Sequence, residues 1–496
     1  MELMYQSTRS EGTKVTASQA ILKGLAPDGG LFVPESIPTL DKSFEELSKM
    51  SYAEVAYEVM KLMLDDFTEE ELRDCINKAY DSKFDTKEIA PLVKADGAYF
   101  LELFHGSTIA FKDMALSILP HLLITSAKKN NVKNDIVILT ATSGDTGKAA
   151  MAGFADVPGT KIIVFYPKHG VSPIQEKQMV TQKGDNTYVI GINGNFDDAQ
   201  TGVKNIFGDK ELEKVMNNAG YQFSSANSIN IGRLVPQIVY YVYAYARLIA
   251  KGEIKAGEKI NAVVPTGNFG NILAAFYAKN MGLPINKLIC ASNENKVLYD
   301  FFSTGTYDRN RDFILTTSPS MDILISSNLE RLLYHLTGED DKLINEWFTA
   351  LKTSGRYEVN ESVKAAIKEN FYAGCCNDEE TKGAIKEVFG EYSYLMDTHT
   401  AVAYKVYEDY KKNTGDNTKT LIASTANPYK FGFAVYDALG GETEGVDEFE
   451  LIGKLEKLTK TTCPKALSDT KNKPVRFTGS IKPEEMSKAV LEFINK

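Results

Sequence analysis

The sequence predicts an α/β protein built on open, mostly parallel sheets with flanking helices, and two observations carry this prediction. Short apolar runs have the length and β-branched content of buried strands, at 136–141, 161–166, 187–192, 260–266, 288–292 and 420–424. Segments with helical periodicity lie between them, at 146–154, 174–181, 197–207, 234–250 and 271–281. Strands that alternate with helices in this way usually pair in parallel, because a crossover through a helix returns the chain in the same direction.

A chain of 496 residues is too long for one hydrophobic core, so the sequence predicts several parts. Residues 1–95 contain charged helical stretches from about 44 to 80 and indicate a small N-terminal domain. We expect a catalytic α/β region of two subdomains over 96–440. It includes a charged, mostly helical excursion at about 300–415, which should pack around the sheet. Residues 441–496 are expected to pack on the catalytic region.

Composition narrows the class of protein and its partners. Hydrophobic residues make up 43% and charged residues 25% of the chain, as in ordinary soluble proteins, and a net charge of -10 disfavours nucleic acid as a partner. No segment has membrane-spanning length, and Met1–Gln6 lacks the basic start of a secretory signal, so we expect a cytoplasmic protein without a membrane partner. The cysteines lack metal-type spacing and the histidines are scattered, so we expect reduced thiols and no metal site.

The segment His105–Asp113 contains a lysine where a helix should be apolar. If Ser107 or Thr108 caps the helix that follows, Lys112 lies on the inward face. The other residues of that face are Ala115, Leu116 and Leu119. Burial can lower the pKa of a lysine by up to roughly 3 to 5 units, and the neutral amine is a nucleophile. Such a lysine suits a carbonyl cofactor that forms an imine, of which pyridoxal phosphate is the commonest.

An alternative placement of Lys112 stays open at this point. Its four-carbon stem could run along apolar surface and keep the ammonium group in water. Pro120 should also kink or end the helix after about two turns, so only those turns support an inward placement.

Two strand-to-helix turns could hold an anion. Thr142–Lys148 follows the first predicted strand, and Gly267–Asn271 follows the strand at 260–266. Glycines allow positive φ and a close approach to a ligand, and the free amides of a helix N-terminus attract phosphate or carboxylate. Either segment could also be an ordinary structural turn. The first lacks the glycine at 142 and the hydroxyl residue at 149 of a Walker loop, and the second lacks the third glycine of a dinucleotide fingerprint.

Further motifs accompany these features, in order, over more than 400 residues. They are YQSTRS at 5–10, DGGL at 28–31, HGSTIAFKD at 105–113, TSGDTG at 142–147, SPIQEKQM at 172–179, FDDAQ at 196–200, NSINIGR at 227–233, GNFGN at 267–271 and STANP at 424–428. With them the chain resembles the threonine synthase family of fold type II pyridoxal-phosphate enzymes, which have the tryptophan synthase β-like fold.

The resemblance implies a role for each candidate around the cofactor. Lys112 would form the imine with pyridoxal 5'-phosphate, and Thr425 would hydrogen-bond the pyridine nitrogen, leaving the ring a weaker electron sink than a carboxylate partner would. Phe111 could pack against the cofactor or serve as an ordinary core aromatic. The cofactor phosphate would be wrapped by Gly267, Asn268, Phe269, Gly270 and Asn271.

The family's reaction converts O-phospho-L-homoserine and water into L-threonine and phosphate, the last step of threonine biosynthesis. The resemblance therefore implies a pyridoxal-phosphate-dependent carbon–oxygen lyase. In it, the Lys112 amine would remove protons at Cα and Cβ, phosphate would leave from Cγ, and water would add at Cβ.

The substrate of that reaction needs two anion sites. Arg233 is the leading candidate for its phosphate, because a guanidinium group can donate two parallel hydrogen bonds, with a structural ion pair as the alternative. Lys148 could also reach the phosphate or could face solvent. The substrate carboxylate and the region of the cofactor 3-hydroxyl would suit the helix start at Ser143, Gly144, Asp145 and Thr146.

Asn427 departs from the family pattern, because many members have histidine at this place. The same candidate residues would also serve a related fold type II lyase, such as a serine or threonine dehydratase or a phosphohomoserine phospholyase that releases 2-oxobutyrate. A non-catalytic relative is a further alternative, which the presence of Lys112 disfavours. Both a monomer and a homodimer fit the resemblance.

Overall fold

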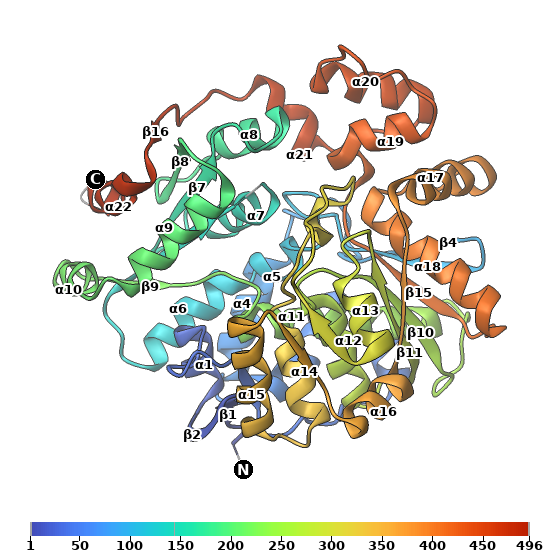
Figure 1. Cartoon of the computed structure of the whole chain (residues 1–496), viewed down its shortest axis with the longest axis horizontal. Helices are drawn as coiled ribbons and strands as arrows, with labels where there is room; N and C mark the ends of the chain where they lie inside the picture. Colours follow the sequence, from blue (N-terminus) through green and yellow to red (C-terminus); the bar gives the residue numbers. More distant parts are fainter. Residues whose placement is uncertain (1, 143, 495–496) are drawn as a thin grey trace.

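The computed structural model describes residues 2–142 and 144–494. Two largely parallel sheets form the body of the molecule, and helices α5 (Asp113–Leu116) and α11 (Ile231–Ala250) lie between them (Figure 1). Helix α11 is buried almost from end to end, as expected of a helix that is apolar on all sides. The predicted α/β class is confirmed.

The N-terminal part combines a small antiparallel sheet with helices. Its strands, in the order β2-β1-β3, are β1 (Tyr5–Ser7), β2 (Ser10–Val15) and β3 (Phe32–Pro34). Its helices are α1 (Ala17–Lys23), α2 (Phe44–Leu47), α3 (Tyr52–Met63) and α4 (Glu69–Ala79). Each of the four begins with a capping box, in which a Ser or Thr side chain and a Gln or Glu three residues later satisfy the first free amides.

The larger sheet has six strands in the order β14-β11-β10-β15-β5-β4. They are β4 (Leu92–Ala95), β5 (Ala98–Glu102), β10 (Ile260–Pro265), β11 (Ile285–Ser292), β14 (Phe371–Cys375) and β15 (Thr420–Ser424). Strand β4 pairs antiparallel with β5, and the other pairings are parallel. Helix α12 (Gly270–Asn280) connects β10 to β11.

The smaller sheet has five parallel strands in the order β16-β8-β7-β6-β9. They are β6 (Asp135–Ala141), β7 (Thr160–Pro167), β8 (Thr187–Ile192), β9 (Tyr221–Ser224) and β16 (Ser480–Ile481). The helices around it are α6 (Leu119–Lys129), α7 (Asp145–Phe154), α8 (Pro173–Val180), α9 (Phe196–Gly208), α10 (Lys210–Asn218) and, near the C-terminus, α22 (Met486–Ile494) (Figure 1).

The excursion after β11 is mostly helical, as expected, but it also contributes the edge strand β14 to the larger sheet. A five-residue strand that contains Gly374 gave too weak a pattern to be recognised. The elements around it are α13 (Val297–Thr304), β12 (Thr306–Asp308), η1 (Pro319–Met321), α14 (Leu329–Leu336), α15 (Asp341–Thr353), β13 (Arg356–Glu358), α16 (Glu361–Asn370), α17 (Asp378–Tyr392) and α18 (Thr398–Thr414).

The chain after β15 contacts helices of the larger sheet and a strand of the smaller one. Helix α20 packs on α19 and α8, while β16 extends the smaller sheet beside β8. The elements here are η2 (Pro428–Phe431), α19 (Gly432–Ala438), α20 (Glu448–Thr459), α21 (Lys465–Ser468), η3 (Asp469–Asn472) and η4 (Pro483–Glu485). None of the helices in the described part of the chain combines the length and apolar character needed to span a bilayer.

Candidate active site

The candidate residues converge from the carboxyl ends of strands in both sheets. The turn 142–148 follows β6, the turn 267–271 follows β10, and Thr425 follows β15. Ligands of open α/β proteins bind at these strand ends. The fold therefore brings the two predicted anion-binding turns to one region.

The helix near Lys112 does not begin where the sequence suggested. We expected a cap at Ser107 or Thr108, but α5 begins at Asp113. The Asp113 carboxylate accepts hydrogen bonds from the Thr108 amide, at 2.8 Å, and the Thr108 hydroxyl, at 2.6 Å. These bonds close a turn in which Ile109 has a φ of 53°, so the helical-face argument was wrong.

Lys112 nevertheless points inward. Its side chain is 15% exposed, and its Nζ atom lies 3.9 Å from a carboxylate oxygen of Asp145 and 3.5 Å from the Ser320 hydroxyl. Burial lowers the pKa of Lys112, Asp145 opposes this, and the cations Lys430 and Arg233 lower the pKa further. The balance favours a larger neutral fraction than an exposed lysine has.

Lys430 is a buried residue of the site that sequence reasoning missed. Its Nζ atom lies 3.2 Å from Asp145 and donates to the Thr108 carbonyl at 2.7 Å. Burial would raise the pKa of Asp145, but Lys430 and Lys112 outweigh it and lower the pKa to about 2. The only sequence signal was the nearness of Lys430 to the motif at 424–428.

A backbone bridge joins the segments of Lys112 and Thr425. The Phe111 amide donates to the Thr425 carbonyl at 2.8 Å, and the Asn427 amide donates to the Ile109 carbonyl at 3.0 Å. Thr425 is buried, and Phe111 is half-buried against the main apolar cluster. The candidates Phe111 and Thr425, far apart in the sequence, thus lie on paired backbone, with Lys112 next to Phe111.

Asn427 has a capping role in this structure. Its side-chain oxygen accepts a hydrogen bond from the Tyr429 amide at 3.1 Å, which caps the short helix η2.

The turn 267–271 has the shape and donors of an anion site. A side chain at Gly267 would collide with the Ser320 carbonyl, since a Cβ atom there would lie 2.6 Å from that oxygen. We expected a glycine to supply the positive φ of this turn. In the structure the residue with positive φ is Phe269, at 65°. The side-chain nitrogen Nδ2 of Asn271 is buried without a hydrogen-bond partner among the described residues, and the first backbone amides of helix α12 are free at its N-terminus. An oxyanion such as a phosphate fits this donor set.

The turn 142–148 is organised by Thr142, whose hydroxyl accepts from the amides of Gly144 and Gly147, both at 3.0 Å. Gly144 has a φ of 148°, and α7 begins at Asp145. Thr146, in the first turn of α7, is half-buried. Ser143, also predicted for this turn, lies outside the described residues.

Lys148 turns inward from α7. It donates to the side-chain oxygen of Gln182. Burial lowers the pKa of Lys148 to about 7, and the cations Lys473 and Lys430 act in the same direction. The alternative of a solvent-facing Lys148 is therefore not supported.

Arg233 lies in the first turn of α11 and is 3% exposed. Its Nη1 donates to the Ala226 carbonyl at 2.6 Å, while its Nε is buried without a partner among the described residues. Burial lowers the pKa of Arg233 to about 10. No carboxylate lies within ion-pair distance of Arg233 among residues 2–142 and 144–494, which disfavours the structural ion pair.

Ser320 and His399 also escaped the sequence analysis. The Ser320 amide donates to His399 Nε2 at 3.1 Å, and His399 Nδ1 lies 2.7 Å from an oxygen of buried Asp397. Because Nε2 accepts, the proton of the neutral ring is on Nδ1, facing Asp397. This contact holds the turn that carries Ser320 beside Lys112.

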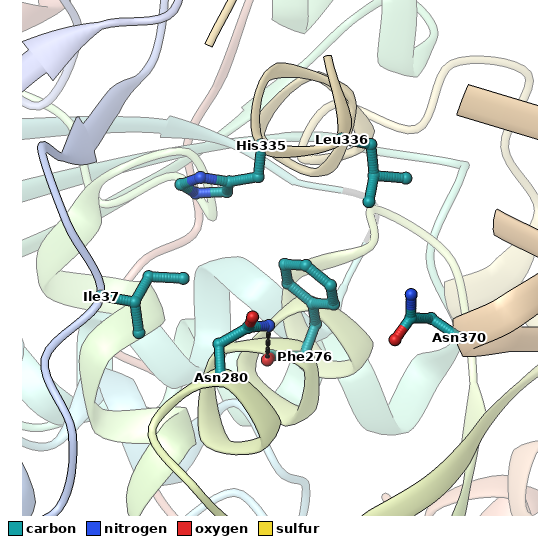
Figure 2. Close-up of a pocket in the computed structure, with 6 residues that line it drawn as sticks. All are labelled: Ile37, Phe276, Asn280, His335, Leu336 and Asn370. Atoms are coloured by element: carbon teal, nitrogen blue, oxygen red, sulfur yellow. Dashed lines mark hydrogen bonds between the residues drawn. The ribbon is translucent and has the colours of Figure 1, made fainter. Parts of the chain in front are cut away.

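A cavity of about 400 Å³ lies elsewhere, at the end of α12 opposite to Gly270 (Figure 2). Its lining residues are Ile37, Phe276, Asn280, His335, Leu336 and Asn370. Within the residues that the structure describes, no group of three or more His, Cys, Asp or Glu side chains could hold a metal ion.

Comparisons with known proteins show which family the chain is similar to. The family models "Threonine synthase N terminus" and "Threonine synthase, C-terminal" match residues 4–80 and 400–493. Threonine synthase from Saccharomyces cerevisiae is 37% identical over 519 aligned residues, which cover 98% of this chain and 99% of the yeast protein.

Solved structures give the same result. The crystal structure of PLP-bound threonine synthase from Brucella melitensis has a TM-score of 0.89 and 34% identity, covering 100% of both chains. The yeast threonine synthase crystal structure has a TM-score of 0.88 and 35% identity, covering 99% of each chain. With relatives this similar along its whole length, the chain belongs to the threonine synthase family.

Proposed function

We propose that the protein converts O-phospho-L-homoserine and water into L-threonine and phosphate with pyridoxal 5'-phosphate as cofactor. The observation that best supports this is the environment of Lys112. Its amine is directed inward beside Asp145, and cations at Lys430 and Arg233 favour the neutral form. A neutral amine is the form that attacks a carbonyl group and removes a proton.

Three parts of the chain would hold the cofactor. We assign its aldehyde end to Lys112, its phosphate to the turn 267–271, and its ring nitrogen to the Thr425 hydroxyl, with Phe111 beside the ring. The backbone bridge between Phe111 and Thr425 fixes the first and third of these relative to each other. When bound, pyridoxal phosphate withdraws electrons from the substrate and makes its Cα proton more acidic.

Lys112 would carry protons between substrate carbons. When Nζ takes a proton, the resulting ammonium lies 3.9 Å from the Asp145 carboxylate, which stabilises the charge. When Nζ gives the proton up, burial favours the neutral form. Burial thus favours release of the proton and Asp145 favours its uptake, as a group that both accepts and donates requires.

Arg233 is our candidate ligand for the substrate phosphate. Its buried Nε has no protein partner among the described residues, and a buried donor left unpaired costs about 1–3 kcal/mol or more. A phosphate oxygen would satisfy it. Lys148 is the second candidate, because substrate phosphate would offset the cost of its buried charge.

The substrate carboxylate is assigned to the start of α7, at Ser143, Gly144 and Thr146. Backbone amides at a helix start suit a carboxylate. Asp145 stays ionised, with a pKa of about 2, so its own side chain would repel that carboxylate. Its partners are instead the cations Lys430 and Lys112.

The domain boundaries, the oligomeric state, the location and the partners of the protein are also proposals. We propose an N-terminal domain over 1–95, a catalytic region over 96–440 and a C-terminal segment over 441–496. We further propose a cytoplasmic monomer or homodimer that acts on a small molecule and not on nucleic acid, which the net charge of -10 supports.

The test is to add O-phospho-L-homoserine to the purified, pyridoxal-phosphate-loaded protein and identify the products. We expect threonine and phosphate in equal amounts. Release of 2-oxobutyrate and ammonia with the phosphate would instead identify a related fold type II lyase. Absence of phosphate release from loaded protein would contradict both activities.

A further inference from the structure

The turn 267–271 is held from behind by residues of the excursion. The Ser326 hydroxyl donates to the Gly267 carbonyl at 2.7 Å. The Asn268 carbonyl accepts from Asn328 twice, from its backbone amide at 3.1 Å and its side-chain amide at 3.0 Å. Within a trans peptide plane, the carbonyl and the next amide point in opposite directions. The amides of Asn268 and Phe269 therefore point away from Ser326 and Asn328.

Asn328 makes these contacts instead of capping its own helix. It is the residue before α14, where asparagine usually accepts from a helix amide, but its side chain makes no such bond. Its oxygen accepts from Arg331 Nη1 at 2.6 Å, and its amide also donates to the Ser228 carbonyl at 3.3 Å. Both Asn328 and Arg331 are fully buried.

Arg331 connects this contact to two other parts of the chain. Its Nε donates to the Phe32 carbonyl of β3 at 2.9 Å, and its Nη2 donates to the Ile229 carbonyl at 2.6 Å. Ile229 lies just before α11, whose first turn carries Arg233. Burial lowers the pKa of Arg331 to about 10, so the fold holds a costly buried charge where it joins these segments.

We propose that Asn328 and Arg331 are positioning residues that turn the amides of Asn268 and Phe269 toward the cofactor phosphate. This inference rests on the proposed function, which assigns the cofactor phosphate to the turn 267–271. Arg331 fixes the side-chain oxygen of Asn328, so that the Asn328 amide nitrogen must face the Asn268 carbonyl. Neither residue needs to touch the cofactor.

The substitution Asn328→Asp tests this directly. The new carboxylate keeps an oxygen acceptor for Arg331, so the buried charge stays paired and the variant should fold. Its second oxygen faces the Asn268 and Ser228 carbonyls in place of a donor, which should rotate the turn. The measurement is the dissociation constant of pyridoxal phosphate and, separately, of pyridoxal, followed by absorbance and fluorescence in the cofactor-free protein.

Pyridoxal has the aldehyde but lacks the phosphate, so the ratio of the two constants isolates phosphate binding. We expect Asn328→Asp to weaken pyridoxal phosphate binding by about 10- to 100-fold with little change for pyridoxal. Arg331→Lys should weaken it by about 3- to 10-fold, because one ammonium cannot reach all of the arginine's partners. The exposed Asn417, which bonds a carbonyl two residues away, gives the control variant Asn417→Ala, with both constants unchanged.

Two results would overturn the inference. One is that both dissociation constants stay unchanged in Asn328→Asp, and the other is an equal loss of affinity for both ligands, which indicates a general structural role. If the wild-type protein shows no preference for pyridoxal phosphate over pyridoxal, the assignment of the phosphate to this turn fails as well. Wild-type preference that persists in the variant contradicts only the positioning role.

Discussion

The Nζ atom of Lys430 lies 3.2 Å from the Asp145 carboxylate, and the two side chains are 2% and 9% exposed. The same Nζ donates to the Thr108 carbonyl, and Thr108 in turn holds Asp113 at the start of α5. One buried ion pair therefore connects the turn after β6 with the turn that precedes Lys112.

Replacing Lys430 should alter the titration of Lys112. Lys430→Met removes a cation that lowers the pKa of Lys112 and leaves Asp145 to pair with Lys112 alone, so that pKa should rise. Because Lys112 acts as a base in its neutral form, we expect the acidic limb of kcat against pH to shift to higher pH and activity at pH 7 to fall by about 10-fold or more. The exposed Lys210 provides the control Lys210→Met. A wild-type pH profile in Lys430→Met would show that this cation does not influence the base.

The covalent attachment of the cofactor can be mapped chemically. Lys112 has a lowered pKa, and its Nζ atom lies 3.5 Å from the hydroxyl of Ser320, whose carbonyl faces Gly267, so we expect borohydride to fix pyridoxal phosphate on this Nζ atom. Peptide mass spectrometry after reduction should find the added mass at Lys112, and Lys112→Ala should carry none. Label at Lys148 or Lys430 in the wild-type protein would contradict the assignment.

Much of the fold followed from local sequence patterns. The predicted strands 187–192 and 420–424 coincide with β8 and β15, because strands buried on both faces appear as continuous apolar runs. Helix α9 was predicted within one residue at each end from its helical periodicity, and in the structure a capping box at Asn195 marks its start.

The site depended more on contacts between distant parts of the chain. Ser320 is 208 residues from Lys112, and no periodic pattern marks it or Lys430 as buried polar residues of the site. The start of α5 was misplaced because the Asp113 carboxylate takes the Thr108 amide and hydroxyl. A preference for Ser or Thr at a helix start could not show this competing contact.

The half-buried Lys148 should make the free energy of unfolding depend on pH. Its pKa in the folded protein is about 7, below the roughly 10.4 of an unfolded lysine. Below pH 7 the folded protein bears the full free-energy cost of a charged Lys148. This cost decreases as the pH rises from 7 toward the pKa of lysine in the unfolded chain. We expect Lys148→Gln to raise the unfolding midpoint of the cofactor-free protein by about 2–6 °C at pH 6, with a smaller gain at pH 9. Calorimetry that finds an equal gain at both values would argue against a buried charge.

Arg233 provides the test that separates substrate phosphate from cofactor phosphate. Arg233→Ala should leave pyridoxal phosphate bound, because the turn 267–271 stays intact. It should lower kcat/KM for phosphohomoserine by a factor of about 10 to 1000, from loss of a charged hydrogen bond worth roughly 1.5–3 kcal/mol and of positioning.

Arg233→Lys should recover only part of that loss, because an ammonium keeps the attraction but not the paired donors of the guanidinium. The control is Arg73→Ala, since Arg73 is exposed on α4 and pairs with Glu69. Cofactor affinity is measured by titration in every variant. Normal kinetics in Arg233→Ala would indicate that Lys148, rather than Arg233, binds the substrate phosphate. The pKa of Lys148 is about 7, so a bound anion would stabilise its charged form. Loss of cofactor or fold in Arg233→Ala but not in Arg233→Lys would instead show that the charge of Arg233 supports the structure around Ala226, to whose carbonyl it donates.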